Sequence, residues 1–236
     1  ADLSSVWQTA QEIGRALNGN TVIVNKSTVP VGTTVRMQQI IEQEIAARQS
    51  SVTFHIASNP EFLREGSAIG DFSHPHRTVL GSTDKDAANK VAQLHLPLRA
   101  PIVITDLRTA EMIKYASNAF LATKISFINE IANICEALGA DVKEVAAGMG
   151  YDARIGRHFL DAGLGWGGSC FPKDVKALIH MAGMAQKPSR LLEAVEARNE
   201  SQKHVLAQKI ISKFGADLTG KTIGVWGLAF KPGTDD

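Results

Sequence analysis

Helix and strand patterns alternate through the first hundred residues, and this alternation limits the possible folds more than any other feature of the sequence. Stretches rich in β-branched and apolar residues predict strands at 21–25, 52–57, 77–81 and 102–105. Amphipathic patterns predict helices at 4–17, 32–48 and 84–96. Because helices and strands follow one another in turn, we expect a parallel α/β sheet, of the kind that makes up half of a nucleotide-binding domain.

The pattern changes after Asp106. A helical pattern without a Gly or Pro runs from about Thr109 to Leu138, much longer than an average helix. Further helices are predicted at 142–149, 171–184 and 189–214, with a glycine-rich loop at 163–170 and a strand at 221–226. We therefore expect three parts: the remainder of one α/β domain at 1–107, an all-helical central domain at 108–214, and the start of a second α/β domain at 215–236.

The bulk composition excludes several classes of protein. The 236 residues include 25 basic and 24 acidic ones, so the net charge of +1 gives no reason to expect a nucleic acid or a membrane surface as partner. Two cysteines, Cys135 and Cys170, are too few for a disulfide framework, and no apolar stretch is long enough to span a membrane. These features predict a reduced, cytoplasmic protein. The chain opens on an amphipathic pattern without a leader, which suggests that further sequence precedes it.

The glycine-rich loop ends in the strongest candidate for chemistry, Cys170, which precedes Pro172, Lys173 and Asp174. Proline suits the first turn of a helix, so Cys170 is expected at a helix N-terminus. There the helix dipole and Lys173 would favour the thiolate, and Asp174 would lie one turn later on the same face. The alternative is a buried structural cysteine beside a flexible loop. Cys135 lies in an apolar stripe in mid-helix and is expected in the core.

A second candidate follows the strand predicted at 52–57. Asn59 could cap a helix that begins at Pro60, which would place Glu61 and Glu65 on one face. Ligands bind at the carboxyl ends of strands in α/β sheets, so either glutamate could act as a general base. The alternative is that both acids only stabilise a helix N-terminus.

Weaker signals come from two other places. Lys114 and Asn118 are four residues apart on the long helix, so a cation and an amide donor could together stabilise an oxyanion, although a solvated helix face is equally consistent. Thr28 offers a hydroxyl to a cofactor or water, unless it belongs to an ordinary strand-to-helix turn. His74 and His76 have no third or fourth ligand nearby, so we predict no metal site.

Six stretches, in this order, resemble the UDP-glucose/GDP-mannose dehydrogenase family. They are KSTVPVGT at 26–33, SNPEFLREGSAI at 58–69, EMIKYASNAFLA at 111–122, RIG at 154–156, GWGGSCFPKD at 165–174 and GLAFKPGTD at 227–235. The resemblance covers essentially the whole chain, and the combination is specific. It implies a partial Rossmann-like domain, a helical dimerisation domain, and the first strand of a second Rossmann-like domain.

The chemistry that the resemblance implies is a four-electron oxidation of UDP-glucose to UDP-glucuronate, with two hydrides transferred to two NAD molecules. Cys170 would be the nucleophile, which forms first a thiohemiacetal and then a thioester. Glu61 would be the base for thioester hydrolysis. Lys114 and Asn118 would stabilise the oxyanion. The resemblance also assigns the catalytic water to Asp174 and Thr28.

Binding roles are implied in the same way. The family contacts NAD at the positions of Thr28, Glu65 and Lys173. It contacts the sugar nucleotide at the positions of Glu61, Phe62, Leu63, Lys114, Asn118, Arg154, Gly167 and Lys231. The resemblance further implies a homodimer through the central helices, in which Arg154 reaches the substrate of the neighbouring subunit.

The sequence departs from the family pattern at three places. The glycine-rich dinucleotide fingerprint is absent, the second nucleotide-binding domain would extend past residue 236, and Asp161 stands where many UDP-glucose members carry lysine. We therefore expect residues 1–236 alone to be inactive. The RIG stretch and the glycine after Glu65 favour the UDP-glucose branch. The alternatives are a GDP-mannose dehydrogenase, a hydroxyacid dehydrogenase that needs no cysteine, and an inactive dimerising fragment.

Overall fold

The computed structural model describes residues 2–234, and the chain divides into two compact units, Ala1–Ala116 and Ser117–Asp236. Ala1, Asp235 and Asp236, at the ends of the first and third predicted domains, lie outside the described residues. One long helix, α5 (Leu107–Leu138), contributes residues to both units. The domain limits drawn from the sequence at 107 and 214 therefore remain predictions.

The first unit contains a four-stranded sheet of order β1-β2-β3-β4. Its strands are β1 (Thr21–Asn25), β2 (Phe54–Ser58), β3 (Thr78–Ser82) and β4 (Ile102–Thr105). The pairs β1–β2 and β3–β4 are parallel, as predicted, but β2 and β3 are antiparallel, so the prediction of a parallel sheet is wrong for this pair. The link between them holds only the short helix α3 (Ala68–Ser73), in place of the full helix that usually joins parallel strands.

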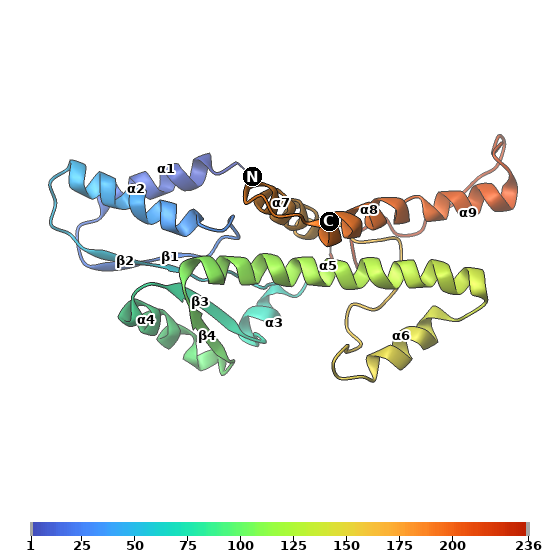
Figure 1. The fold of residues 1–236 in the computed structure, drawn as a ribbon, viewed down its shortest axis with the longest axis horizontal. Coiled ribbons are helices and arrows are strands. Elements are labelled where there is room, and N and C mark those ends of the chain that lie inside the picture. Colours follow the sequence, from blue (N-terminus) through green and yellow to red (C-terminus); the bar gives the residue numbers. More distant parts are fainter. Residues whose placement is uncertain (1, 235–236) are drawn as a thin grey trace. The chain divides into compact units, whose positions relative to one another are not determined.

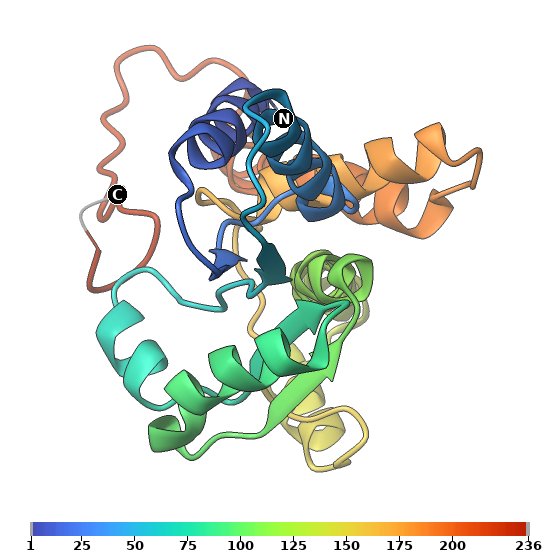
Figure 2. The same cartoon turned by 90° about the vertical axis from the view of Figure 1, so that its left-hand side faces the viewer.

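Helices cover both faces of this sheet (Figures 1 and 2). On one face, α1 (Ser4–Ala16) and α2 (Thr33–Ala47) share a core with Ile23 and Ile56. On the other face, α4 (Lys85–His95) shares a core with Val24 and Ala57, and the 3-10 helix η1 (Leu96–Leu98) follows it. Neighbouring residues of β1 and β2 enter different cores because successive side chains of a strand point to opposite faces. The predicted α/β class is confirmed.

No helix begins at Pro60, and the prediction that Asn59 caps one is wrong. Asn59 instead extends the sheet: its backbone N–H donates to the carbonyl of Asn25 at 2.8 Å, and its side-chain amide donates to the carbonyl of Val79 at 2.9 Å. Its side-chain oxygen accepts from Lys26 Nζ at 2.7 Å. A capping side chain accepts from the backbone of its own helix, whereas this oxygen accepts from the side chain of Lys26. Glu61 and Glu65 therefore do not share a helical face.

The second unit is helical. After α5 come α6 (Val142–Gly150), α7 (Phe171–Met184), α8 (Arg190–Gln202) and α9 (Val205–Phe214). Trp166, Val175 and Val195 bury their side chains together with the small Ala119 and Ala122 of α5. A second cluster joins Ile128, Ala146 and Leu160. The predicted helical middle is confirmed.

The prediction of a single helix at 189–214 is wrong in one respect: the helix is interrupted at Lys203 and His204, which separate α8 from α9. His204 N–H donates to the carbonyl of Ser201, three residues back, and the next α-helical bond begins with its own carbonyl. No Gly or Pro marks the break. Gln202, the last residue of α8, is 4% exposed and gives its amide to the carbonyl of Gly163, so a contact outside the helix holds this turn.

The strand predicted at 221–226 is absent from the part of the chain that the structure describes. All four strands described for residues 2–234 belong to the first unit, so this segment has no neighbouring strand with which to form a ladder. Its Trp226 is fully exposed.

None of the helices described between residues 2 and 234 has the length and apolarity that crossing a bilayer requires.

Candidate active site

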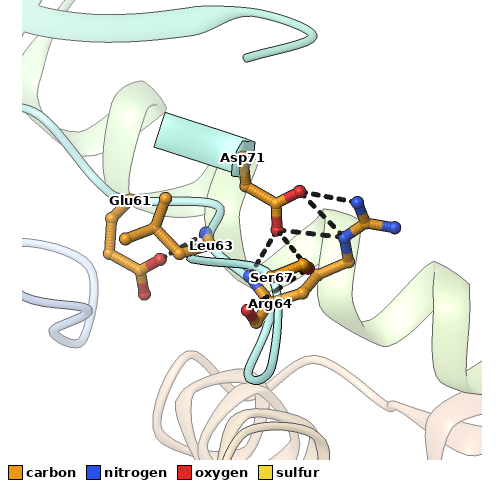
Figure 3. A network of polar contacts seen from close by, with 5 residues as sticks. All are labelled: Glu61, Leu63, Arg64, Ser67 and Asp71. Carbon is orange, nitrogen blue, oxygen red and sulfur yellow. Dashed lines mark hydrogen bonds and ion pairs between the residues drawn. The ribbon is translucent and has the colours of Figure 1, made fainter. Parts of the chain in front are cut away.

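A buried lysine faces a partly exposed glutamate in the first unit. Lys114 comes from α5 and Glu61 from the link after β2, and Lys114 Nζ lies 3.5 Å from Glu61 Oε1. The lysine side chain is 5% exposed and the glutamate side chain 35%. A buried ammonium group needs a nearby negative charge, because burial without one is costly. The other glutamate oxygen accepts the backbone N–H of Leu63 at 2.6 Å, and Figure 3 shows both residues.

The ring of Phe62 lies close to Lys114 and to a further cation, Arg77. The Arg77 guanidinium lies 3.9 Å from the centre of the Phe62 ring, and Lys114 Nζ lies 5.1 Å from it. Burial lowers the pKa of Arg77. Arg77 was not among the residues predicted from the sequence, because only the fold brings the beginning of β3 next to Phe62.

A third cation lies near Glu61. Lys26, just after β1, donates to Asn59 as described above, and burial lowers its pKa while attraction to Glu61 partly opposes that shift. Thr28 lies partly buried in the same link between β1 and α2. The carboxylate of Glu61 therefore has two lysines, Lys114 and Lys26, as neighbours near the carboxyl ends of β1 and β2, which agrees with the predicted place of a ligand site.

Glu111 anchors this link to α5. It is 2% exposed, and its carboxylate accepts the backbone N–H groups of Gly32 at 2.6 Å and Thr34 at 2.8 Å, at the beginning of α2. Negative charge at a helix N-terminus is favourable, and the two bonds are charge-assisted. Sequence reasoning missed Glu111, although its position one turn before Lys114 on α5 was a signal.

In the second unit a buried aspartate holds an amide and an ammonium group. Asp174, in the first turn of α7, is 1% exposed. Its two oxygens accept from Asn118 Nδ2 and from Lys173 Nζ, each at 2.6 Å. Asn118 is buried as well, so the alternative of a solvated helix face is wrong for both Lys114 and Asn118. Lys173 is paired with Asp174, and its expected effect on the Cys170 thiolate stays a prediction.

Cys170 lies at the N-cap position of α7 and is half-buried, as expected for a group at a helix N-terminus. Pro172 is in the first turn, as predicted, and the backbone N–H of Asp174 donates to the carbonyl of Cys170 at 3.0 Å. Ser169 Oγ lies 3.7 Å from the Cys170 sulfur. Cys135 is buried on α5, as predicted.

Three buried amide side chains hold the glycine-rich loop that leads to Cys170. Asn199 Oδ1 accepts the N–H of Trp166 at 2.8 Å, and Asn199 Nδ2 donates to the Trp166 carbonyl at 2.9 Å. Gln202 donates to the carbonyl of Gly163 at 2.7 Å, and Asn129 accepts the N–H of the same residue at 2.7 Å. A Cβ atom on Gly165 would lie 2.6 Å from Asn199 Oδ1, so this position requires glycine. Sequence reasoning missed all three amides.

The remaining predicted residues of the second unit differ in their surroundings. A Cβ atom on Gly168 would lie 2.3 Å from the ring of Phe230, so the segment that carries Lys231 packs on the loop that carries Gly167. Arg154 is 89% exposed and pairs with Asp152 at 2.5 Å.

Two further predicted positions, one in each unit, are also exposed. Asp161 binds Arg157, whose hydrogen bond lowers the pKa of Asp161. Glu65 lies in an exposed turn of the first unit. The structure thus brings together most of the predicted groups within each unit, but places Arg154 and Glu65 on the surface.

Comparisons with known proteins agree with one another. Residues 1–99 match the profile of the UDP-glucose/GDP-mannose dehydrogenase family, NAD binding domain, and residues 108–201 match the central domain of the same family. The UDP-glucose 6-dehydrogenase TuaD of Bacillus subtilis is 56% identical over 236 residues, which are 100% of this chain and 50% of that protein. The UDP-glucose 6-dehydrogenase of Pseudomonas aeruginosa is 49% identical over 239 residues, 100% of this chain and 53% of that protein.

Solved structures give the same result. A UDP-glucose dehydrogenase from the archaeon Pyrobaculum islandicum superposes with a TM-score of 0.84 at 42% identity, over 91% of this chain and 50% of that one. A GDP-mannose dehydrogenase from Pseudomonas aeruginosa superposes with a TM-score of 0.61 at 34% identity, over 89% of this chain and 50% of that one. The chain spans about half the length of these relatives.

Proposed function

Because the chain belongs to the UDP-glucose/GDP-mannose dehydrogenase family, we propose that the protein of which it forms part oxidises UDP-glucose to UDP-glucuronate with NAD. The observation that carries this proposal is the buried Lys114 beside Glu61, on the same helix as Asn118 beside Asp174. A carboxylate that can act as a base and donors that can stabilise an oxyanion suit a cysteine-dependent oxidation of an alcohol to an acid. The 56% identity to a UDP-glucose 6-dehydrogenase favours UDP-glucose over GDP-mannose.

The reaction takes place in two oxidations and one hydrolysis. The C6 alcohol loses a hydride and its hydroxyl proton to become an aldehyde, and the thiolate of Cys170 adds to that aldehyde to give a thiohemiacetal. Loss of a second hydride and a proton gives a thioester, which water cleaves to the carboxylic acid and the free thiol. NAD supplies the hydride acceptor at both oxidations. Four electrons leave the substrate in all.

The structure supports separate roles for the two polar pairs. Lys114 and Asn118 stabilise the negative charge on the substrate oxygen in each tetrahedral intermediate. An amide nitrogen carries two N–H donors, and only one from Asn118 is used by Asp174, so the other can serve the oxyanion. Glu61, more exposed than its lysine partner, activates the hydrolytic water, which Asp174 and Thr28 help to position.

Thr28 and Glu65 of the first unit and Lys173 of the second unit are the residues that would hold NAD. Thr28 offers a hydroxyl and Glu65 a carboxylate, which suit the ribose and the carboxamide of this cofactor, and Lys173 adds a cation. The N–H groups at the beginning of α2 are already bound by Glu111, so α2 does not provide the phosphate site that helix N-termini often form.

The sugar nucleotide contacts Phe62, Leu63, Gly167 and Lys231, besides Glu61, Lys114 and Asn118. We assign Arg154 to the substrate of a neighbouring subunit, which agrees with its 89% exposure. The homodimer forms through the helical unit. On α5, Phe120, Phe127 and Ile134 are 64%, 46% and 47% exposed and recur every seven residues, a spacing typical of helices that pair.

The test is a titration of the full-length protein with limiting UDP-glucose and excess NAD. We expect two NADH for each UDP-glucose and UDP-glucuronate as the product. A parallel titration with GDP-mannose is expected to give no NADH. Turnover of GDP-mannose in preference to UDP-glucose would contradict the substrate, and one NADH per substrate would contradict the thioester route.

A further inference from the structure

One carboxylate organises the loop between β2 and α3. Asp71 accepts the backbone N–H of Arg64 at 2.8 Å, and it accepts from the same residue's guanidinium through Nε at 3.0 Å and Nη2 at 2.6 Å. Ser67 Oγ donates to it at 3.1 Å. Figure 3 shows these four contacts converging on the Asp71 side chain. Asp71 and its partners Arg64 and Ser67 are called the loop clamp below.

The loop clamp is the main feature that orders this segment. α3, which carries Asp71, has no buried residue, and its apolar Ile69 and Phe72 are 86% and 52% exposed. No helical hydrogen bonds hold residues 59–64. Phe62 packs on Arg77 near the beginning of the segment, but α3 buries no residue, so its position depends on polar contacts.

The loop clamp is connected to the predicted catalytic carboxylate through one peptide. Arg64 follows Leu63, and the N–H of Leu63 donates to Glu61 Oε2 at 2.6 Å. The other oxygen of Glu61 lies 3.5 Å from Lys114 Nζ. Asn59 fixes the beginning of this short segment to the sheet, and Asp71 fixes its end at Arg64. The orientation of the Glu61 carboxylate therefore depends on both anchors.

We propose that Asp71 is a positioning residue, which acts through Arg64 and Leu63 to hold Glu61 in place for thioester hydrolysis and Leu63 in place for the sugar nucleotide. This inference rests on the proposed function. The loop clamp contributes little to overall stability, because the Arg64 side chain is 61% exposed and exposed ion pairs are worth little. Loss of the clamp should therefore affect catalysis far more than folding.

The experiment compares Asp71→Ala with Asp71→Asn, Glu61→Gln and the matched control Glu44→Ala in the full-length protein. Glu44 also binds an arginine through two bonds, at 2.9 and 3.1 Å from Arg15, but far along the chain from the loop. We expect Asp71→Ala to lower kcat by roughly 10- to 100-fold, as misplacement of a reacting group by about 1 Å does. Asp71→Asn keeps one acceptor oxygen and replaces the other with an NH2 donor, so it should retain more activity than Asp71→Ala. Glu44→Ala should have unchanged kcat and KM.

A second readout separates positioning from a structural defect. With UDP-glucose and excess NAD, quenched Asp71→Ala should carry a covalent adduct on the peptide that contains Cys170, as Glu61→Gln should. Hydrogen exchange should rise in residues 61–71 and stay unchanged in the sheet. An adduct in Glu61→Gln but none in Asp71→Ala would overturn this inference and leave the proposed function standing. No adduct in either variant would overturn the hydrolytic role of Glu61, and this inference with it.

Discussion

Asn199 offers the sharpest test of how the loop before Cys170 is held. The residue is 2% exposed, and its amide makes two hydrogen bonds with the backbone of Trp166, one to the N–H and one to the carbonyl. Asn199→Ala removes both partners and leaves two buried backbone groups unpaired. Asn199→Asp keeps the shape and the acceptor but places a second oxygen against the Trp166 carbonyl.

The expected cost follows from these contacts. An unpaired buried backbone group costs about 1–3 kcal/mol, so the two groups left by Asn199→Ala should lower the free energy of unfolding by roughly 2–6 kcal/mol. Asn199→Asp should cost more at neutral pH, because it also buries a charge. Burial raises the pKa of the new carboxyl in the folded state. The Asn199→Asp variant is therefore most stable at low pH, where the carboxyl is neutral, and it loses stability as the pH rises through that pKa. Asn199→Asp should therefore approach wild type below about pH 4.

Urea denaturation of the full-length protein at several pH values measures these changes. Ser201→Ala is the matched control, because Ser201 lies on the same helix, is exposed, and its hydroxyl donates to the carbonyl of Ala197 one turn back. It should change the free energy of unfolding by less than about 0.5 kcal/mol. The rate of Cys170 alkylation should rise in Asn199→Ala, since the loop loses its anchor. Equal stability in Asn199→Ala and Ser201→Ala would refute the role given to this amide.

Three other predictions concern the chemistry and the assembly. Cys170→Ser should abolish steady-state turnover in folded protein, because an alkoxide is much harder to form than a thiolate near neutral pH, whereas Cys135→Ser should leave most activity; equal losses would mean that the nucleophile is misassigned. A mixture of Arg154→Ala and Cys170→Ala proteins, each inactive alone, should have roughly a quarter of its active sites functional after random subunit exchange, because about half of the dimers are mixed and each mixed dimer has one site with both groups. If exchange is verified and no activity returns, Arg154 acts in the site of its own subunit. Hydrogen bonding to Arg64 lowers the pKa of Asp71 far below its usual value, so the carboxylate stays charged and hydrogen exchange in residues 61–71 should stay low as the pH falls to 4. A rise in hydrogen exchange of this loop already at pH 5 would contradict the pairing of Asp71 with Arg64.

Much of the fold was predictable because local patterns determine it. The strands at 21–25 and 102–105 agree with the prediction residue for residue, and the family is confirmed by both matched domains. The errors arose where distant contacts decide the local structure. Asn59 and Pro60 form a good helix start by sequence, yet the sheet uses the side chain of Asn59. The break at Lys203 likewise follows from a contact of Gln202 with the loop at Gly163.

The residues of the candidate site that lie in contiguous motifs could be predicted from the sequence, and the isolated ones could not. Cys170, Glu61 and Asp174 stand in contiguous stretches, so their types and spacing pointed to chemistry. Glu111 and Asn199 act on segments far from them in sequence, and a single polar residue in a helical pattern looks like part of a solvated face. The homodimer, the cytoplasmic location and the individual catalytic roles stay predictions.

The polar residues of α5 explain why its contacts were hard to predict from the sequence. Glu111, Lys114, Asn118, Ser126 and Asn129 are all buried, although an amphipathic helix normally buries an apolar stripe. Each has a partner in another segment: the beginning of α2, the link after β2, the first turn of α7, the backbone of α8 and the glycine-rich loop. Buried polar groups are costly unless they are paired, so such a stripe persists only where the partners are held in return. Within the first unit, α5 thereby holds the beginning of α2 and the link after β2, and within the second unit it holds the first turn of α7, the backbone of α8 and the glycine-rich loop.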